Sequence, residues 1–541
     1  MAPPRHWGAA ATAASPPRSS SVIASLAPLA LLLLIAAAAA AHGASVALGA
    51  AAITVDTSVV LLFMSDIDGG EGSQCAQMAR RAMETNGSTV NFVVTGYYRT
   101  DGNNRMTDLG YREAERDREL RQYTYDTAYR LSSGLTACMQ LVVSRGFGLA
   151  VHLHLDDGDE TGTWRNALDF DPYTKFGALS YWDALVKPAA AAVKDANFRG
   201  APVLFAMQAE MGATLFYSAR SYRSMIKQIK GVVSEGGTPP SSVRVGVNLN
   251  WEKICGCPGN AMASTTYYSD VQARWREVTD SVSLADVRAL FRAVDWIGVS
   301  AYAGLPDSPG PADLEESLRR VDRELRLFGL DLRSLNKDLV YSEYGVGGGE
   351  TADYKTPARD WPHAAAAPYW GVDGRYDPRS DPWARGGNRA ALRRFYNTTL
   401  QFAAAGGGPN YKVRAIFLWS IISFDVTGVH YLSYARGGTA GGAANSRAGG
   451  APGGAAGGSY RDPVITAAIR QYNSAVKRLR AAGAAPAAPT APGSPAPNAT
   501  LPRNSTSTNA GVALVPAFRA AGMPGLAATA AADAAAAVSP L

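Results

Sequence analysis

Residues 202–212 read Pro-Val-Leu-Phe-Ala-Met-Gln-Ala-Glu-Met-Gly, an apolar run that ends in a carboxylate at Glu210. Strands that are buried on both faces read as continuous apolar runs of this kind. Seven similar runs lie between residues 55 and 480, separated by longer amphipathic stretches. Together they predict eight strands, at residues 59–65, 90–95, 148–153, 203–207, 243–249, 296–300, 339–342 and 415–419.

The stretches between these runs predict helices, because their apolar residues recur three and four positions apart. The candidate helices are residues 126–144, 219–233, 314–327 and 389–404, with a last helix near residues 464–479. Eight strands that alternate with helices predict a single (β/α)8 TIM barrel of the α/β class. An open doubly wound sheet is the alternative, although no Gly-x-Gly-x-x-Gly follows the first strand.

The N-terminal segment has the composition of a secretory signal. Arg5 and Arg18 precede an apolar run over residues 22–41, and small residues follow through Ala44. The same run could remain as a membrane anchor, and an organelle transit peptide is a further reading. We expect residues 1–44 to be a signal peptide or signal anchor. The protein is then secreted or extracellular, or else membrane-anchored with a lumenal or extracellular barrel.

The middle of the chain predicts one folded domain with an appended tail. We expect the catalytic domain to cover residues 55–480, with a Gly-rich loop at residues 436–459. Residues 481–541 are rich in Ala, Pro, Ser and Thr. Because such a segment lacks the apolar bulk that would offset its ordering entropy, we expect a disordered, low-complexity tail.

The cysteines and the glycosylation sequons fit an oxidising, secretory compartment. Cys75, Cys138, Cys255 and Cys257 are an even number, which permits disulfides, but their pairing stays open. Cys255-Gly-Cys257 lacks the paired spacing of a zinc site, so no metal and no other cofactor is expected. The Asn-x-Ser/Thr sequons begin at Asn86, Asn397, Asn498 and Asn504.

The charge pattern argues against a nucleic-acid-binding protein. The formal net charge is only +6, from 52 Lys and Arg against 46 Asp and Glu, and the two signs are interspersed. Nucleic-acid binding needs a concentrated basic face. We therefore expect no nucleic-acid partner.

Two glutamates end apolar runs at equivalent places. Active sites of such barrels form at the ends of the strands, and Glu210 ends the fourth predicted strand while Glu343 ends the seventh. These strands face each other across the barrel mouth. One isolated Glu would more often be a cap or an ion-pair partner. Two at equivalent strand ends predict the pair of carboxyl groups, in different protonation states, that glycoside cleavage needs.

The segments around these strand ends resemble those of clan A glycoside hydrolases, and most closely the β-mannanase-type family 113, over residues 58–425. The segments that carry the resemblance are Thr95-Gly-Tyr-Tyr-Arg, His152-Leu-His-Leu-Asp with Thr163-Trp-Arg, Gln208-Ala-Glu-Met-Gly, Asn248-Leu-Asn-Trp, Asp295-Trp-Ile-Gly-Val-Ser-Ala-Tyr, Tyr341-Ser-Glu-Tyr-Gly and Phe417-Leu-Trp-Ser. The resemblance implies Glu210 as acid/base and Glu343 as nucleophile. Many clan members carry Asn before the acid/base, where it contacts the sugar 2-hydroxyl, whereas this chain has Ala209. Family 113 tolerates that difference, which favours a mannanase and leaves the 2-hydroxyl contact unassigned.

Polar and aromatic residues at other strand ends are candidates for substrate binding. Tyr302 ends the sixth strand and is placed to donate its hydroxyl to Glu343, unless it is a rim aromatic. Trp419 ends the eighth and offers a flat face for stacking on a sugar, or else packs in the core. Asn250 and Trp251 end the fifth strand and would line the same cleft.

Further candidates come from the first three strands. Trp164 and Arg165 follow the third strand and either grip a neighbouring sugar or act as packing clamps. His152 and His154 share one face of that strand and either bond sugar hydroxyls or are core histidines; no third metal ligand is evident. The ends of the first two strands add Asp66, Tyr97 and Arg99 as candidates.

These observations predict a retaining, endo-acting glycoside hydrolase for a β-linked polysaccharide, with β-1,4-mannan as the first choice. A β-glucanase or galactanase of the same clan is the alternative, as is an inactive glycan-binding barrel of the cell wall or matrix. The expected partner is a polysaccharide or oligosaccharide, with a membrane involved only if the N-terminal segment stays uncleaved, and the protein is expected to be a monomer. For retention the two carboxyl groups should lie about 5–5.5 Å apart. We also expect ionised Glu343 to raise the pKa of Glu210.

Overall fold

The computed structural model describes residues 48, 51–114, 117, 119–159, 164–235, 239, 242–258, 267–346, 360–366, 383, 387–419, 426–430 and 461–484. All of the described residues belong to one compact unit. The predicted signal segment, the Gly-rich loop and the tail from residue 485 onward lie outside the described residues. Within the described part of the chain, no helix combines the length and the apolar character needed to cross a membrane.

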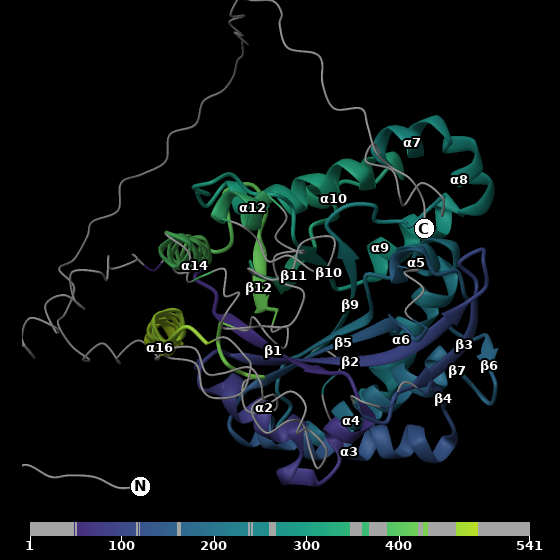
Figure 1. Cartoon of the computed structure of the whole chain (residues 1–541), viewed down its shortest axis with the longest axis horizontal. Coiled ribbons are helices and arrows are strands. Elements are labelled where there is room, and N and C mark those ends of the chain that lie inside the picture. The colour runs from purple at the N-terminus through teal and green to yellow at the C-terminus, as the bar shows by residue number, and fades with distance from the viewer. Residues whose placement is uncertain are drawn as a thin grey trace, which may run out of the picture. The chain divides into compact units, whose positions relative to one another are not determined.

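Eight parallel strands form a closed barrel (Figure 1). Each strand pairs with the next in the order β1-β12-β11-β10-β9-β8-β5-β2, and β2 pairs back onto β1 to close the ring. The barrel strands are β1 (Val55–Leu61), β2 (Thr89–Thr100), β5 (Gly148–Asp157), β8 (Val203–Ala209), β9 (Val243–Asn250), β10 (Trp296–Ala301), β11 (Asp338–Tyr344) and β12 (Val413–Leu418). The predicted (β/α)8 fold is therefore confirmed, and the open sheet is excluded.

All eight strands overlap the predicted ranges, but β1 begins at Val55 and ends at Leu61, earlier than the predicted residues 59–65. Residues 56–58 are polar, so the sequence did not predict them as part of a buried strand. They are buried nevertheless, and the Asp56 carboxylate accepts a hydrogen bond from the Ser88 amide at 2.7 Å. After Leu61 the chain turns into the short helix η1 (Met64–Ile67). Asp66 causes this turn, since its carboxylate accepts from the amides of residues 62 and 63, both at 2.9 Å.

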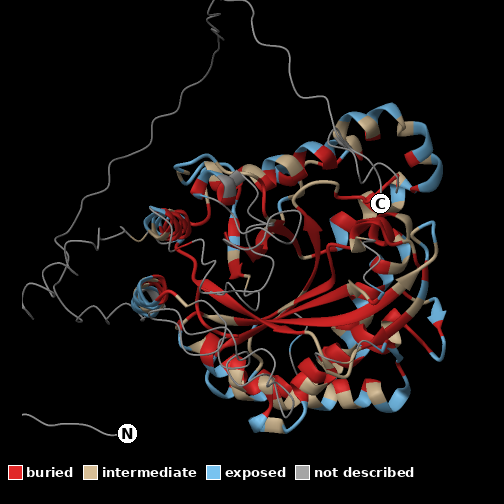
Figure 2. Ribbon diagram, in the orientation of Figure 1, coloured by how far each residue is buried: buried red, intermediate tan, exposed pale blue. Residues whose placement is uncertain are grey.

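Helices surround the barrel, and their buried faces pack on the outside of the strands, which Figure 2 shows as almost continuously buried. The predicted helices appear as α3 (Tyr125–Ser144), α6 (Ala219–Ser234), α10 (Glu316–Leu327), α14 (Asn388–Ala404) and α16 (Pro463–Ala484). The others are α2 (Gln74–Met83), α4 (Lys187–Ala196), α5 (Gly212–Tyr217), α7 (Tyr267–Ala273), α8 (Trp275–Ser281), α9 (Leu284–Ala293), α11 (Leu332–Leu335) and α12 (Trp361–Ala366).

Trp296 fills the interior of the barrel. It is fully buried in a cluster with Ala150, Ala206, Val340 and Phe417, separate from the core under the helices. A side chain at Gly246 would come within 2.3 Å of its ring, and one at Gly298 within 2.8 Å. The two glycines on neighbouring strands therefore make the space for this indole. Because this cluster fills the middle of the barrel, active-site residues must lie between it and the C-terminal ends of the strands.

Short strands and disulfides add to the barrel. Strand β2 continues past the ring and pairs with β3 (Met106–Tyr111), which pairs with β4 (Arg121–Gln122); β6 (Lys175–Phe176) and β7 (Leu179–Ser180) form a separate sheet. Cys75 and Cys138 link α2 to α3, and Cys255 pairs with Cys257, so no cysteine is free.

Candidate active site

Glu210 lies at the turn that immediately follows β8. Its φ is +57°, in the left-handed region that costs a residue with a side chain about 1–2 kcal/mol. The Gln208 side chain stabilises the turn. Its Nε2 donates to the Asn248 backbone carbonyl at 2.9 Å, and its Oε1 accepts from the Met211 backbone amide at 2.8 Å. The Glu210 amide also donates to the Asn248 carbonyl, at 3.1 Å. This strained and well-bonded turn fixes the direction of the Glu210 side chain.

Both oxygens of the buried Glu210 carboxylate have donors. Oε2 lies 3.1 Å from Nη1 of Arg165. Oε1 accepts from the side-chain amide of Asn250, also at 3.1 Å. Asn250 ends β9 and Arg165 begins the short helix η3 (Arg165–Ala167) after β5, so three neighbouring strands contribute to this carboxylate. The structure thus places Arg165 and Asn250 against Glu210, while their predicted contact with a sugar stays a prediction.

Glu343 enters the mouth from β11. It is 4% exposed, and the pairing of β11 with both neighbouring strands shifts register close to it. Such bulges re-aim side chains near active sites. The Tyr302 hydroxyl, just beyond β10, donates a hydrogen bond to the Glu343 carboxyl group. This contact was predicted from the sequence.

The two carboxyl groups meet in the mouth, together with His154 of β5. One atom from each of His154, Glu210 and Glu343 lies within 4.8 Å of the other two. This spacing would also allow a divalent cation. The Arg165 guanidinium, however, already pairs with Glu210 and would oppose a second cation there. The arrangement is suited to sharing a proton between two carboxyl groups.

Burial raises the pKa of Glu343 well above its usual range, and the nearby Glu210 carboxylate raises it further. The charge of Arg165 and the hydrogen bond from Tyr302 act in the opposite direction. From the sequence we expected a raised pKa at Glu210, whereas the structure raises the pKa of Glu343, the other member of the pair. Arg165, which the sequence did not place beside the pair, lies against Glu210.

Asp156 is a residue that the sequence reasoning missed. Its carboxylate lies 2.5 Å from Nη2 of Arg165 and 3.3 Å from Nδ1 of His154. Burial opposes its ionisation, but His154 and Arg165 together hold the pKa of Asp156 below its usual range. The signal was present, because Asp156 shares a strand face with His154 at a spacing of two. Asp156 thus orients the Arg165 guanidinium, which contacts Glu210.

His152 lies deeper in the barrel than His154. Its Nδ1 donates to the Asn91 side-chain oxygen at 2.5 Å, and its ring lies edge-on to Trp296 and Phe417. Burial, and next His154, lower the pKa of His152 to about 3, so the ring is neutral. Of the two readings of His152, the structure favours the core histidine over the sugar contact.

The aromatic candidates on the rim differ in what they offer a substrate. Trp419 directly follows β12, is half-buried, and its ring centre lies 6.1 Å from that of His154. Its indole nitrogen is buried without a hydrogen-bond partner among the described residues. Trp251, by contrast, has the guanidinium of Arg320 over its ring at 4.8 Å. Trp419 is therefore better placed to bind a sugar in the mouth.

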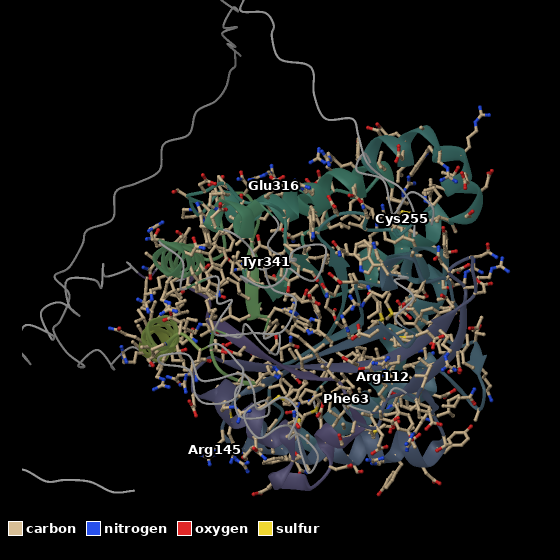
Figure 3. The ribbon with its side chains drawn as sticks, viewed as in Figure 1. Phe63, Arg112, Arg145, Cys255, Glu316 and Tyr341 are labelled. Carbon is tan, nitrogen blue, oxygen red and sulfur yellow. A yellow bond between two sulfur atoms is a disulfide. The ribbon has the colours of Figure 1, made fainter. Side chains whose placement is uncertain are left out.

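The remaining candidates lie around β2 and η3. Tyr97 is paired in register with Asp156 and buried, with the Arg112 guanidinium (labelled in Figure 3) 4.7 Å from its ring centre. Arg99 forms ion pairs with Asp159 at 2.8 Å and with Asp108 at 3.5 Å. These pairs hold Arg99 at the β2–β3 hairpin and not beside the glutamates. Trp164 is half-buried directly before η3.

Comparison with known proteins gives only distant likenesses. No protein-family model matches the chain, and no curated protein matches it in sequence. Among solved structures it is similar to a GH113 β-1,4-mannanase, with 12% identity, 78% of this chain and 99% of that chain covered, and a TM-score of 0.40. It is also similar to the GH113 β-mannanase AaManA from Alicyclobacillus acidocaldarius, with 16% identity, 79% and 100% coverage and a TM-score of 0.40. A glycoside hydrolase family 5 mannosidase from Rhizomucor miehei has 10% identity, 80% and 95% coverage and a TM-score of 0.35.

Proposed function

We propose that this protein is a retaining glycoside hydrolase that cleaves a β-linked polysaccharide, with Glu210 as acid/base and Glu343 as nucleophile. The observation that carries the proposal is the meeting of two buried carboxyl groups from β8 and β11, with oxygens within 4.8 Å of each other. Retaining glycosidases need close carboxyl groups because the nucleophile must reach the anomeric carbon directly, whereas inverting enzymes leave room for a water.

In the first step, Glu343 attacks the anomeric carbon while the bond from that carbon to the glycosidic oxygen breaks. Glu210 gives its proton to the leaving oxygen, so the product is an alcohol and a glycosyl ester of Glu343. This step needs Glu343 ionised and Glu210 protonated. The charge of Arg165 and the contact with the Tyr302 hydroxyl both lower the pKa of Glu343, against the effect of burial, and so favour the ionised nucleophile.

In the second step, water attacks the same carbon and the ester bond to Glu343 breaks. Glu210 takes the proton of the water, which restores one proton to the pair. Two displacements at one carbon leave the configuration of the sugar unchanged. Trp419 would stack on the sugar, and Asn250 and Arg165 would keep Glu210 oriented through both steps.

The substrate assignment to β-1,4-mannan with endo action rests on the sequence resemblance to family 113, in which Ala209 is tolerated. Cleavage of a β-glucan or galactan is the second candidate, because the loops that select a substrate vary freely on this fold. A barrel that binds glycans without cleaving them is the candidate of another class. The complete set of Glu210, Glu343, Tyr302 and Arg165 favours the enzyme.

We further propose that the protein is secreted and glycosylated. Two disulfides support an oxidising compartment. Asn397 of α14 is exposed and available to a glycan, whereas Asn86 uses its side-chain amide to donate to Ser474 at 2.8 Å. Of the two sequons in the described residues, Asn397 is therefore the better acceptor.

A product assay tests the function directly. The purified protein is incubated with soluble mannan, glucan, xylan and galactan, and new reducing ends are measured. NMR of the first products then reports their anomeric configuration. The proposal expects cleavage of mannan with β-configured products. Inverted products would refute the double displacement, and binding without cleavage would favour the inactive barrel.

A further inference from the structure

The turn after β9 is closed on itself by the disulfide between Cys255, labelled in Figure 3, and Cys257. Both sulfur-bearing residues are buried, with at most 1% exposed. Gly256 between them has a φ of +57°, and a side chain there would come within 1.8 Å of the Asn166 carbonyl oxygen. The turn therefore packs directly, without spare space, on the residue that follows Arg165.

Asn166 connects this turn to the segment that carries Glu210. Its side chain is completely buried, and its Nδ2 donates to the Lys253 carbonyl. Its Oδ1 accepts from the Gly212 amide at 2.8 Å. Gly212 is two residues after Glu210, and a side chain there would come within 2.3 Å of both Asn166 Oδ1 and the Ile254 carbonyl. Three separate segments thus meet at Asn166.

A buried carboxylate from the helix layer also holds the turn. Glu324 of α10 accepts from the amides of Lys253 and Ile254, each at 2.9 Å. The turn is therefore attached to the outer helix layer by Glu324, closed by the disulfide, and attached to the site by Asn166.

We propose that Asn166 is a positioning residue, through which the disulfide-closed turn of residues 253–257 sets the placement of Arg165 and Glu210. The inference rests on the proposed function, because it names what orients the acid/base of that reaction. Arg165 is the chain neighbour of Asn166, and Glu210 is paired with Arg165 at 3.1 Å. A displacement of the turn would move both members of this ion pair but would leave Glu343 on β11 in place.

The test compares two glycosides of one β-linked oligosaccharide, one with a dinitrophenolate leaving group and the other with an alkoxide. Only the alkoxide needs a proton from Glu210 to depart. In Asn166→Ala and in the double variant Cys255→Ser with Cys257→Ser, kcat/KM for the alkoxide substrate should fall about tenfold or more relative to the dinitrophenyl substrate. Equal loss on both substrates, or no loss on either, would overturn the positioning role.

Matched controls separate positioning from general destabilisation. Asn197 also bridges a backbone amide and carbonyl, both of Ala201, at 2.8 and 2.9 Å, but it does so between α4 and the start of β8. Asn197→Ala should lower the melting temperature without changing the ratio of the two substrates. The double variant Cys75→Ser with Cys138→Ser should do the same. A changed ratio in either control would also overturn the inference.

Hydrogen exchange decides the inference even if the wild-type protein cleaves neither substrate, which would refute the proposed function alone. The Gly212 amide, which donates to Asn166, should exchange about tenfold faster in the Cys255→Ser, Cys257→Ser variant than in the Cys75→Ser, Cys138→Ser variant. Unchanged exchange would show that the turn does not act on this segment through Asn166.

Discussion

The guanidinium of Arg165 lies 3.1 Å from the carboxylate of Glu210 and 2.5 Å from that of Asp156. Its Nε also donates to the Leu155 carbonyl at 2.7 Å, so the side chain is fixed at three points. The planar fork of an arginine suits such a role better than the flexible ammonium of a lysine. Arg165 therefore holds one carboxyl group of the pair directly, and its charge also lowers the pKa of the other, Glu343.

Replacement of Glu343 tests the nucleophile. Glu343→Gln should keep the fold and remove nearly all turnover, because the amide cannot form the glycosyl ester. In Glu343→Ala an added small anion such as azide should restore some activity by occupying the vacated space and should give a product of inverted configuration. Kinetics and NMR of the products measure both effects. Turnover of Glu343→Gln at the wild-type rate would refute the assignment.

Removal of the charge at position 165 should move the pH profile. Arg165 lowers the pKa of Glu343, so its loss raises that pKa, and the pH at which half of the maximal activity remains should shift upward. Arg165→Gln should also reduce kcat/KM by about a hundredfold through misplacement of Glu210. Arg165→Lys is the control, since it keeps the charge and should retain more of the wild-type profile. A profile that stays in place in Arg165→Gln would contradict the proposed electrostatics.

Loss of the indole at position 419 should weaken substrate binding. By analogy with the stacking of bases on aromatic rings, Trp419→Ala should cost about 1–3 kcal/mol in kcat/KM. Trp251→Ala is the comparison, because Arg320 already covers one face of that ring. Calorimetric unfolding checks the fold of both variants. If Trp419→Ala instead melts much earlier with unchanged kcat/KM, Trp419 is a core residue.

Glu324 should make the stability of the protein depend on pH. Burial raises the pKa of Glu324 from 4.5 to about 7, despite the amides of Ile254 and Lys253 that bond it. A raised pKa in the folded state means that stability is fully present below pH 4.5 and is lost as pH rises through about 7. The loss should be on the order of 3 kcal/mol.

Urea unfolding at pH 4.5, 6 and 8 measures this dependence. At low pH the Glu324→Gln variant should be less stable than the wild type, because one acceptor for the amides of Lys253 and Ile254 is gone. Between the lowest and the highest pH, however, its free energy of unfolding should fall less than that of the wild type. The control Glu119→Gln replaces a glutamate whose side chain is 72% exposed and should keep the wild-type slope. An equal slope in Glu324→Gln and wild type would show that Glu324 does not titrate in this range.

The sequence by itself determined the barrel and the two glutamates. Strands that are buried on both faces are largely apolar, so each apolar run predicts a strand. A polar residue directly after such a run is predicted to lie at the mouth of the barrel. Glu210, Glu343, Tyr302 and Trp419 were found in this way. The rule missed the start of β1, where Asp56 is buried with a hydrogen-bond partner that lies 32 positions away in the chain.

Only the tertiary structure decided which groups act on which carboxylate. Spacing along a strand placed His152 and His154 on one face, but the depth of His152 against Trp296 depends on a strand far away in the chain. Arg165 pairs with Glu210 across 45 residues, and Asn166 bonds the turn at Lys253 across 87. The pKa of Glu343 depends on contacts of this kind, because charge and burial act through space. No local pattern of residues encodes these contacts.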